Sequence, residues 1–201
     1  MAPFHPKMFM TIFPLVLALL CGCSLRMPPH ELAANFRLAA GMAAMANMTE
    51  ESYRRNPTST QVFIIEGRAT AVTFNTKEEF DRFVAQLRLP ERTYREQIMQ
   101  RGFQRLASRY LATASEGCSG RSLTSGEVAV EQIDFELTLS HGNRTFSGIV
   151  VESAVSVFFP SGYPSYYYSG KPEPPLIGEI RGEVIEFRDS PSQCVVILKP
   201  N

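Results

Sequence analysis

The chain has 201 residues with 20 basic and 20 acidic side chains, so its formal net charge is zero. Hydrophobic residues make up 44% of the sequence and charged residues 20%, which is ordinary for a globular protein and excludes a disordered or fibrous one. Because there is no basic excess, a nucleic-acid partner is not expected.

The N-terminal residues differ in composition from the rest of the chain. Only Lys7 is fully charged before an apolar run from Met8 to Leu20, which has the length of the hydrophobic region of a signal peptide and is short for a membrane-spanning helix. The sequence Leu20-Cys21-Gly22-Cys23 follows. It resembles the lipobox of bacterial lipoproteins, in which a branched apolar residue lies three positions before the modified cysteine and a small residue directly before it.

This resemblance implies that residues 1–22 are a signal peptide and that Cys23 carries lipid on its thiol and its new amino terminus. Two or more acyl chains hold a protein stably on a bilayer, because each buried methylene contributes about 0.8 kcal/mol. Ser24, which stands where an aspartate would favour the inner membrane, implies the periplasmic face of the outer membrane in a bacterium with two membranes. The alternative is a plain signal peptide with incidental cysteines.

The remaining cysteines, Cys118 and Cys194, would then lie outside the cytoplasm, where pairs of thiols become oxidised. We expect a structural disulfide between them, which contributes up to about 4.5 kcal/mol in the chain-entropy model. The alternatives are two free buried cysteines, or a reactive thiol at Cys118 in its glycine- and serine-rich segment.

Residues 23–60 are predicted to form a lipidated tether that is partly helical. An apolar helical stripe runs through Leu32, Phe36, Ala39 and Ala43. A glycine within the stripe and the small size of most side chains weaken it. The segment is either a docking helix or a spacer, and we favour a partly ordered spacer.

Residues 61–201 are predicted to form one globular domain. It begins with a strand from Gln61 to Phe74, in which Gly67 marks a bend, bulge or turn. Thr76 and Glu79 then form a capping-box pattern, which predicts the start of a helix.

Pro90 is expected to end this helix and to occupy the first turn of a second one. The buried stripe of the second helix consists of Met99, Phe103, Leu106 and Tyr110. Another face carries three arginines at a spacing of four residues, namely Arg101, Arg105 and Arg109. They are candidate contacts for an anionic partner or for phospholipid headgroups, and the alternative is a solvated or acid-paired helix face.

From Glu127 onward the hydrophobic period is two, which predicts strands. The expected order is a strand through Val128 and Leu139 with a bulge near Gln132, a turn at 140–143, a long strand over 145–159, one or two strands around Gly182, and a last strand over 194–198.

These elements predict an α+β fold in which an antiparallel, curved β-sheet has two helices packed on one face. Residues 77–121 carry nine basic and six acidic side chains, whereas residues 122–201 carry five and ten. We therefore expect attraction between opposite charges to support the packing of helices on sheet.

The sequence offers little for catalysis, and no cofactor or metal is expected. Only His30 and His141 follow the signal peptide, and no group of residues has metal-ligand spacing. The strands carry several carboxylates that could act on a glycan if two of them faced each other. Alternation places most of them on the solvent side of a half-buried sheet. These residues are Glu127, Glu131, Asp134, Glu136, Glu179, Glu183 and Glu186.

A segment rich in tyrosine and proline, residues 158–175, is the strongest candidate for a contact surface. Its rigid, amphipathic tyrosines suit contact with a protein, a glycan or a membrane surface. The alternative is a loop whose rings cap the core of its own sheet. The candidate contact residues are Tyr163, Tyr166, Tyr167 and Tyr168.

We therefore expect a lipid-anchored envelope lipoprotein that acts as a non-catalytic binding or assembly module. Its expected partners are the membrane, through the lipid anchor, and an envelope protein or peptidoglycan. The second interpretation is a carrier of a small ligand or lipid with a cavity under the curved sheet. The third is a glycan-acting enzyme that uses the carboxylates of the sheet.

Overall fold

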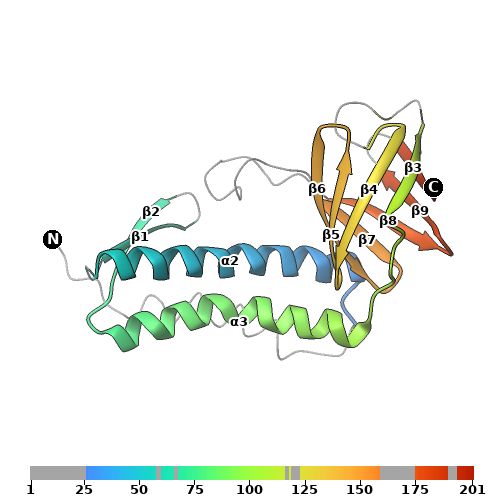
Figure 1. The fold of residues 1–201 in the computed structure, drawn as a ribbon. Coiled ribbons are helices and arrows are strands. Elements are labelled where there is room, and N and C mark those ends of the chain that lie inside the picture. Colours follow the sequence, from blue (N-terminus) through green and yellow to red (C-terminus); the bar gives the residue numbers. More distant parts are fainter. Residues whose placement is uncertain are drawn as a thin grey trace.

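The computed structural model describes residues 26–57, 60–65, 68–115, 118, 123–158, 175–189 and 194–201. It contains two long helices, a two-stranded sheet and a closed antiparallel barrel of eight strands (Figure 1). The α+β class and the antiparallel pairing are confirmed. The expected curved, open sheet is wrong, because the first and last strands of the sheet pair with each other.

The barrel has up-and-down topology, in which each strand pairs with the next one along the chain. Its strands are β3 (Arg109–Ala114), β4 (Gly126–Ile133), β5 (Glu136–His141), β6 (Arg144–Val151), β7 (Ala154–Phe158), β8 (Leu176–Arg181), β9 (Val184–Asp189) and β10 (Cys194–Pro200). The pairing of Leu198 with Ala112 belongs to the β10–β3 contact that closes the barrel. Closure leaves none of these strands with a free edge.

Two of the expected single strands are hairpins. The alternation of apolar and polar residues changes phase before Phe135. This change marks a turn between β4 and β5, where Asp134 has a φ of 52°. The expected long strand is interrupted between β6 and β7, where Glu152 has a φ of 56°. Neither turn contains the glycine, proline or asparagine that usually marks a hairpin in a sequence. The turn before Arg144 and the two strands around Gly182 are confirmed.

The interior of the barrel is filled by side chains that alternate along its strands. Tyr110, Leu139, Phe146 and Phe187 belong to this core, and each is at most 2% exposed. Gly178 points inward, and a Cβ atom built on it would lie 2.5 Å from Cδ1 of Phe187. The described part of the barrel therefore leaves no room even for a methyl group at this position.

The disulfide between Cys118 and Cys194 is confirmed, with a Cα–Cα distance of 4.7 Å. It joins the segment after β3 to the first residue of β10. The adjacent backbone hydrogen bond, in which Ser115 N donates to Val195 O over 2.9 Å, continues the same strand contact. The disulfide thus fastens the point where the barrel closes.

Helix α2 (Pro29–Arg55) occupies most of the segment that we expected to be a partly ordered spacer. Its alanine, leucine and methionine residues have high helix propensity. Pro29 lies in the first turn, where a missing N–H costs nothing, and Arg54 and Arg55 lie in the last turn, where they favour the helix dipole. The ordered part of the chain thus begins well before residue 61.

Helix α3 (Lys77–Arg101) is continuous, so the prediction of two helices separated at Pro90 is wrong. The capping box is confirmed, because Glu79 N donates to Thr76 Oγ1 over 3.2 Å. A proline inside a helix costs about 3 kcal/mol. Burial of Val84 before Pro90 and of Ile98 after it holds both halves in one helix and offsets this cost.

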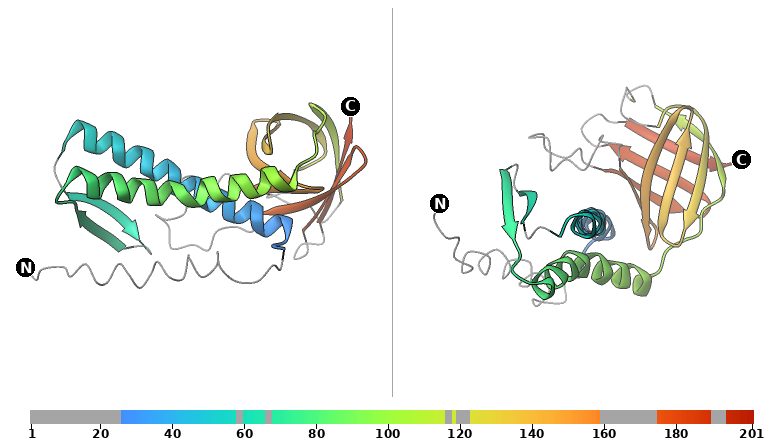
Figure 2. Two further views of the ribbon diagram at one scale, coloured as in Figure 1. Left: turned by 90° about the horizontal axis from the view of Figure 1, so that it is seen from below. Right: turned by 60° about the vertical axis from the view of Figure 1, so that its left-hand side comes forward.

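The two helices run side by side and antiparallel, and they form an arm that leaves the barrel at one end (Figures 1 and 2). At 1.5 Å per residue, α2 is about 40 Å long. The two-stranded sheet of β1 (Thr60–Ile65) and β2 (Arg68–Thr73) lies at the far end of the arm. A small core there includes Phe74 and Phe80, whose ring centroids are 5.3 Å apart.

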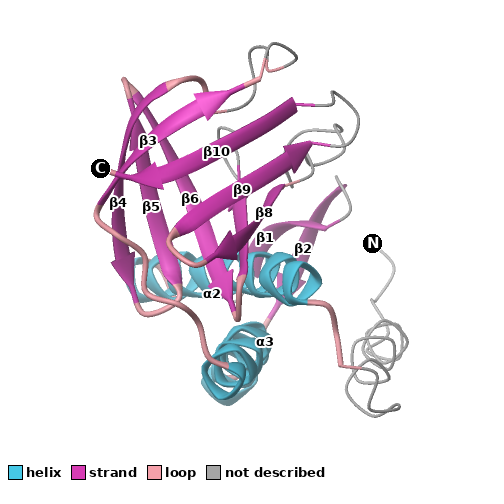
Figure 3. Ribbon diagram, turned by 90° about the vertical axis from the view of Figure 1, so that its right-hand side faces the viewer, coloured by secondary structure: helices cyan, strands magenta, loops and turns pink. Residues whose placement is uncertain are grey.

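The barrel touches only the near end of the arm, where α2 contacts β6 and β7 (Figure 3). Ile98 of α3 joins Leu32 and Phe36 of α2 in one cluster on the outer face of the barrel, so both helices pack on that face, but only through their near ends. A closed barrel curves away from a straight helix, so a long helix can cover only a few strands before it projects past them.

We predict that Gly178→Ala destabilises the protein by about 1–3 kcal/mol, because the added methyl group overpacks the barrel against Phe187. Gly41→Ala in α2 is the matched control. No atom lies within 4 Å of the new Cβ there, so this variant should stabilise the helix by up to about 1 kcal/mol. Denaturant unfolding of both variants measures the two changes, and equal stability at Gly178→Ala would show that the barrel core has spare room.

Candidate functional site

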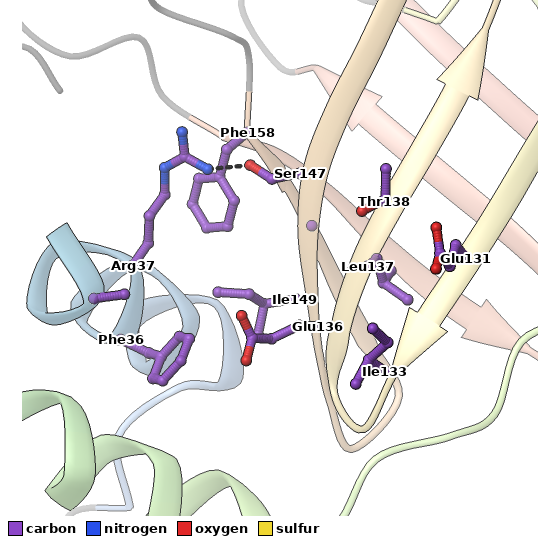
Figure 4. Close-up of a pocket in the computed structure, with 12 residues that line it drawn as sticks. Phe36, Arg37, Glu131, Ile133, Glu136, Leu137, Thr138, Ser147, Ile149 and Phe158 are labelled. Atoms are coloured by element: carbon purple, nitrogen blue, oxygen red, sulfur yellow. Dashed lines mark hydrogen bonds between the residues drawn. The ribbon is translucent and has the colours of Figure 1, made fainter. Parts of the chain in front are cut away.

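A groove of about 400 Å³ lies between the first half of α2 and the outer wall of β4, β5 and β6 (Figure 4). We call it the α2–barrel groove. Phe36 and Arg37 project from the helix, Ile133 and Glu131 lie on the opposite side, and Ile149 lies between them. Because the barrel core is full, this groove is a concave surface built entirely on the outside of the barrel.

The helical side of the groove is held in place by a hydrophobic cluster. Leu32 and Phe36 of α2 pack with Ile149 and Phe158, and all four side chains are at most 7% exposed. The ring of Phe36 meets the ring of Phe135 edge to face, with 5.0 Å between the centroids. The strand ends beneath α2 are consequently buried on both faces, which is unusual for the wall of a small barrel.

A polar junction fastens the same end of the arm to the barrel. Arg101, the last residue of α3, donates to Oε1 of Glu152 over 3.1 Å and to the carbonyl oxygen of Met27 over 2.6 Å. Arg26 also donates to Glu152, and Glu152 N donates to the carbonyl oxygen of Gly102 over 2.8 Å. The residues before α2, the end of α3 and the β6–β7 turn thus meet at one carboxylate.

Arg95 of α3 supports the base of the groove. Its guanidinium donates to Glu91 over 2.7 Å and to Glu136 over 2.8 Å, and it lies 5.1 Å from the centroid of the Phe36 ring. Burial lowers the pKa of Arg95, but the hydrogen bonds to Glu91 and Glu136 outweigh it, so the pKa is raised. The negative charge of Glu136, which lines the groove, is therefore balanced by the ion pair with Arg95.

Arg37 lies at the rim of the groove in a different environment. Its guanidinium donates to Ser147 Oγ and lies 4.4 Å from the centroid of the Phe158 ring (Figure 4). Burial lowers the pKa of this guanidinium. Within the described ranges, no carboxylate lies within ion-pair distance of Arg37.

The barrel side of the groove is partly apolar and partly polar. Ile133 is 68% exposed, which is high for a large apolar side chain. Glu131 pairs with Thr138 in the β4–β5 ladder, and both side chains line the groove. The groove thus combines an apolar floor with hydrogen-bonding groups on one wall and a guanidinium on the other.

The three candidate arginines do not share a helix face, so that expectation is wrong. Arg101 ends α3, Arg105 follows in the connection to the barrel, and Arg109 begins β3. The prediction assumed that the helix continues past Arg101. Instead, Gly102 ends the helix with a φ of 80°. Arg101 is engaged with Glu152, whereas Arg105 and Arg109 are exposed.

The buried stripe predicted for the same helix is also wrong. Met99 is 49% exposed on α3, and Tyr110 lies in β3 with its side chain in the barrel core. The Tyr110 hydroxyl accepts a hydrogen bond from Ala107 N over 3.0 Å. Burial raises the pKa of Tyr110, so its phenol remains protonated in the barrel.

The carboxylates of the strands lie on the outer face of the barrel, as alternation predicted. Glu131 and Glu136 line the groove, but both lie on its barrel wall, two positions apart in the β4–β5 register. Glu179 and Glu186 pair across β8 and β9, and each accepts from a neighbouring arginine.

Other candidate residues have local roles. His141 takes part in hydrogen bonds with Thr124 Oγ1 and with the carbonyl oxygen of Glu127, each over 2.8 Å. Among the described residues, no three His, Cys, Asp or Glu side chains are grouped so that they could hold a metal ion. In the same part of the chain, neither long helix is apolar enough to cross a membrane.

Cys23 and the four candidate tyrosines lie outside the described residues, so their predicted roles stay predictions. Comparisons with protein-family models, with curated proteins and with solved structures found no match. The function must therefore be argued from the geometry of this chain.

Sequence reasoning found Phe36 as part of an apolar stripe, but it missed Arg37 and Ser147. The two residues are 110 positions apart and meet only because α2 packs on β6. Nothing local distinguishes Arg37 from the other arginines of the chain. What distinguishes Arg37 is tertiary, since it depends on burial and on the lack of an ion-pair partner among the described carboxylates.

We predict that Glu152→Gln lowers the free energy of unfolding by about 1 kcal/mol at neutral pH. The hydrogen bond from Arg101 lowers the pKa of Glu152 below the ordinary glutamate value of 4.5. The stabilisation is therefore present above about pH 4.5 and is lost as the pH falls through the lowered folded-state value. The difference between wild type and variant should shrink in that acidic window.

Denaturant unfolding at a series of pH values measures this difference. Glu96→Gln, which changes an exposed carboxylate of α3, is the control and should leave the pH dependence almost unchanged. A constant difference between wild type and Glu152→Gln down to the lowest pH would contradict an ionised role for Glu152.

Proposed function

We propose that the protein is a lipid-anchored binding module of the bacterial envelope, without catalytic activity, that holds a partner in the α2–barrel groove. The lipobox-like sequence ending at Cys23 supports the anchor. The groove supports the binding role. Its partner class is an envelope protein or the peptide part of peptidoglycan, since both are present on the periplasmic side of the outer membrane.

The observation that carries the binding role is the packed interior of the barrel. Eight-stranded barrels that carry small ligands leave an internal space for them. Here the inward side chains of the described strands form one buried hydrophobic cluster, and Phe187 fills the space beside Gly178. An outer groove with exposed apolar and charged groups suits a macromolecular partner better than a small molecule.

The anchor would hold the folded body close to the bilayer. Arg26, which is bound to Glu152 at the junction, comes only three residues after Cys23. Three extended residues span at most about 10 Å. A lipid at Cys23 would therefore place the junction beside the headgroups, without the long spacer that residues 23–60 were expected to supply.

The tyrosines of the segment after β7 remain a second proposed contact. Phe158, the last described residue before that segment, lines the groove. Tyr163 follows it by five positions and Tyr168 by ten. Arg105 and Arg109, both exposed on the barrel side of the junction, remain proposed contacts for anionic groups.

We predict that mature protein from its own host carries acyl chains at Cys23 and lacks residues 1–22. Metabolic labelling with an alkyne fatty acid followed by mass analysis tests this. Cys23→Ser should abolish the label, whereas Cys21→Ser, which changes the neighbouring cysteine, should keep it. An unmodified amino terminus that still bears residues 1–22 would contradict the lipid anchor.

We predict that a photo-crosslinking phenylalanine derivative in place of Ile133 captures a partner in living cells. Ile133 is exposed in the groove, so a partner held there lies within reach of the reactive ketone. Leu111, which is 50% exposed on β3 and does not line the groove, is the control position. Equal capture at both positions, or capture at Leu111 alone, would refute the groove as the binding site.

A further inference from the structure

The geometry points to a peptide segment that ends in a free C-terminal carboxylate as the occupant of the α2–barrel groove, with Arg37 as the residue that binds the carboxylate. This inference rests on the proposed function, because it names the chemistry of a partner for the same groove. It also assigns Arg37 a role in recognition rather than in folding.

Among the half-buried arginines that the structure describes, Arg37 is the one without a carboxylate partner. Four arginines of the described residues are half-buried, and three of them bind a glutamate. Arg88 pairs with Glu50 over 2.5 Å, Arg95 with two glutamates, and Arg101 with Glu152 over 3.1 Å. Arg37 is buried enough to lower its pKa and still has no carboxylate in the described structure.

A desolvated guanidinium without a counter-charge is costly unless a partner supplies one. The guanidinium of Arg37 has five N–H donors, and Ser147 Oγ is the acceptor that it has in the described structure. The guanidinium lies over the Phe158 ring, 4.4 Å from its centroid, and its remaining N–H groups can donate to a planar anion. A carboxylate matches this geometry, since it accepts two parallel hydrogen bonds from one guanidinium.

The rest of the groove requires an apolar group beside the carboxylate. Phe36 and Ile149 form the floor next to Arg37, and the exposed side chain of Ile133 faces them from β4 (Figure 4). An occupant that covered Ile133 would remove apolar surface from water, which contributes about 25 cal/mol per Å².

The occupant is a peptide rather than a fatty acid because of the polar wall. Glu131 and Thr138 line the groove beside the apolar floor. An acyl chain laid across them would bury polar groups without hydrogen bonds, which costs about 1–3 kcal/mol for each group. Peptide N–H groups can donate to Glu131 and Thr138. The closed barrel has no free strand edge, so the peptide must be recognised by side chains and not by strand addition.

The test measures capture of defined peptides by the mature, lipidated protein purified in detergent. The first two probes are random hexapeptide libraries that contain no Asp or Glu. They have the same sequences, but one has free C-terminal carboxylates and the other has C-terminal amides. A third probe is oleate, which carries a carboxylate on an acyl chain. We expect capture of free-acid peptides with an apolar residue near the C-terminus, at least about tenfold over their amides.

Arg37→Gln should lower capture of the free-acid peptides about tenfold, because it removes the charge. Arg37→Lys, which keeps the charge but loses the planar fork, should retain part of it. The control is Arg92→Gln, which changes an exposed arginine of α3 outside the groove and should leave capture unchanged. Thermal melting of each variant verifies that it is folded.

Ile133→Glu supplies a second test, because Ile133 is exposed and its replacement should not disturb folding. The new carboxylate would repel the free-acid peptides and lower their capture about tenfold. Equal capture of acids and amides, or unchanged capture by folded Arg37→Gln or by Ile133→Glu, overturns the inference. Arg37-dependent binding of oleate without binding of peptides also overturns it. Any of these outcomes would overturn only the inference about the carboxylate. Crosslinking of a partner at Ile133 would still support the proposed function separately.

Discussion

The contact between α2 and the outer face of β6 and β7 is the constraint on which the rest of the structure depends. Barrel walls normally alternate between core and solvent, but Ile149, Val151 and Phe158 are buried although they point out of the barrel. Leu32 and Phe36 cover them. Without this contact the groove would have no helical wall, Arg37 would be solvated, and the arm would have no fixed direction.

The uneven distribution of charge along the chain contributes to the contact between the arm and the barrel. The basic excess of residues 77–121 and the acidic excess of residues 122–201 led to the expectation of attraction between helices and sheet. The structure contains such attraction in two contacts, Arg95 with Glu136 and Arg101 with Glu152. Both pairs lie at the end of α3 near the barrel. Electrostatic complementarity thus acts at the junction and not along the whole helix, whose far part has no barrel strand beside it.

Those parts of the fold that depend on local chemistry could be predicted from the sequence. Thr76 and Glu79 marked the start of a helix because a capping box is made within one turn. Gly182 marked a break in the strand pattern without deciding between one strand and two, and in the structure it lies in the β8–β9 turn with a φ of 63°. The disulfide followed from the cysteine count and the expected compartment. Closure of the barrel could not be predicted, because it depends on the pairing of β3 with β10, which are far apart in the chain.

The failures share one cause, which is that tertiary contacts outweigh local preference. Pro90 would break an isolated helix, but burial on both sides of it keeps α3 continuous. The helical spacing of Arg101 and Arg109 was continued beyond Gly102, where the chain leaves the helix and enters the barrel. The weak apolar stripe of α2 became a stable helix because α3 covers it along its length, and β6 and β7 cover its first turns.

The same reasoning explains why the site lies where it does. A barrel whose core is occupied by its own side chains presents only its outer surface to other molecules, and a uniform outer surface has no concave place to hold one. Packing a helix against that surface creates such a place along the line where the helix and the wall diverge. Arg37 lies on this line, close enough to Phe158 to lose water and too far from every described carboxylate to form an ion pair. The arrangement that stabilises the arm therefore also produces the one half-buried, uncompensated guanidinium of the described structure.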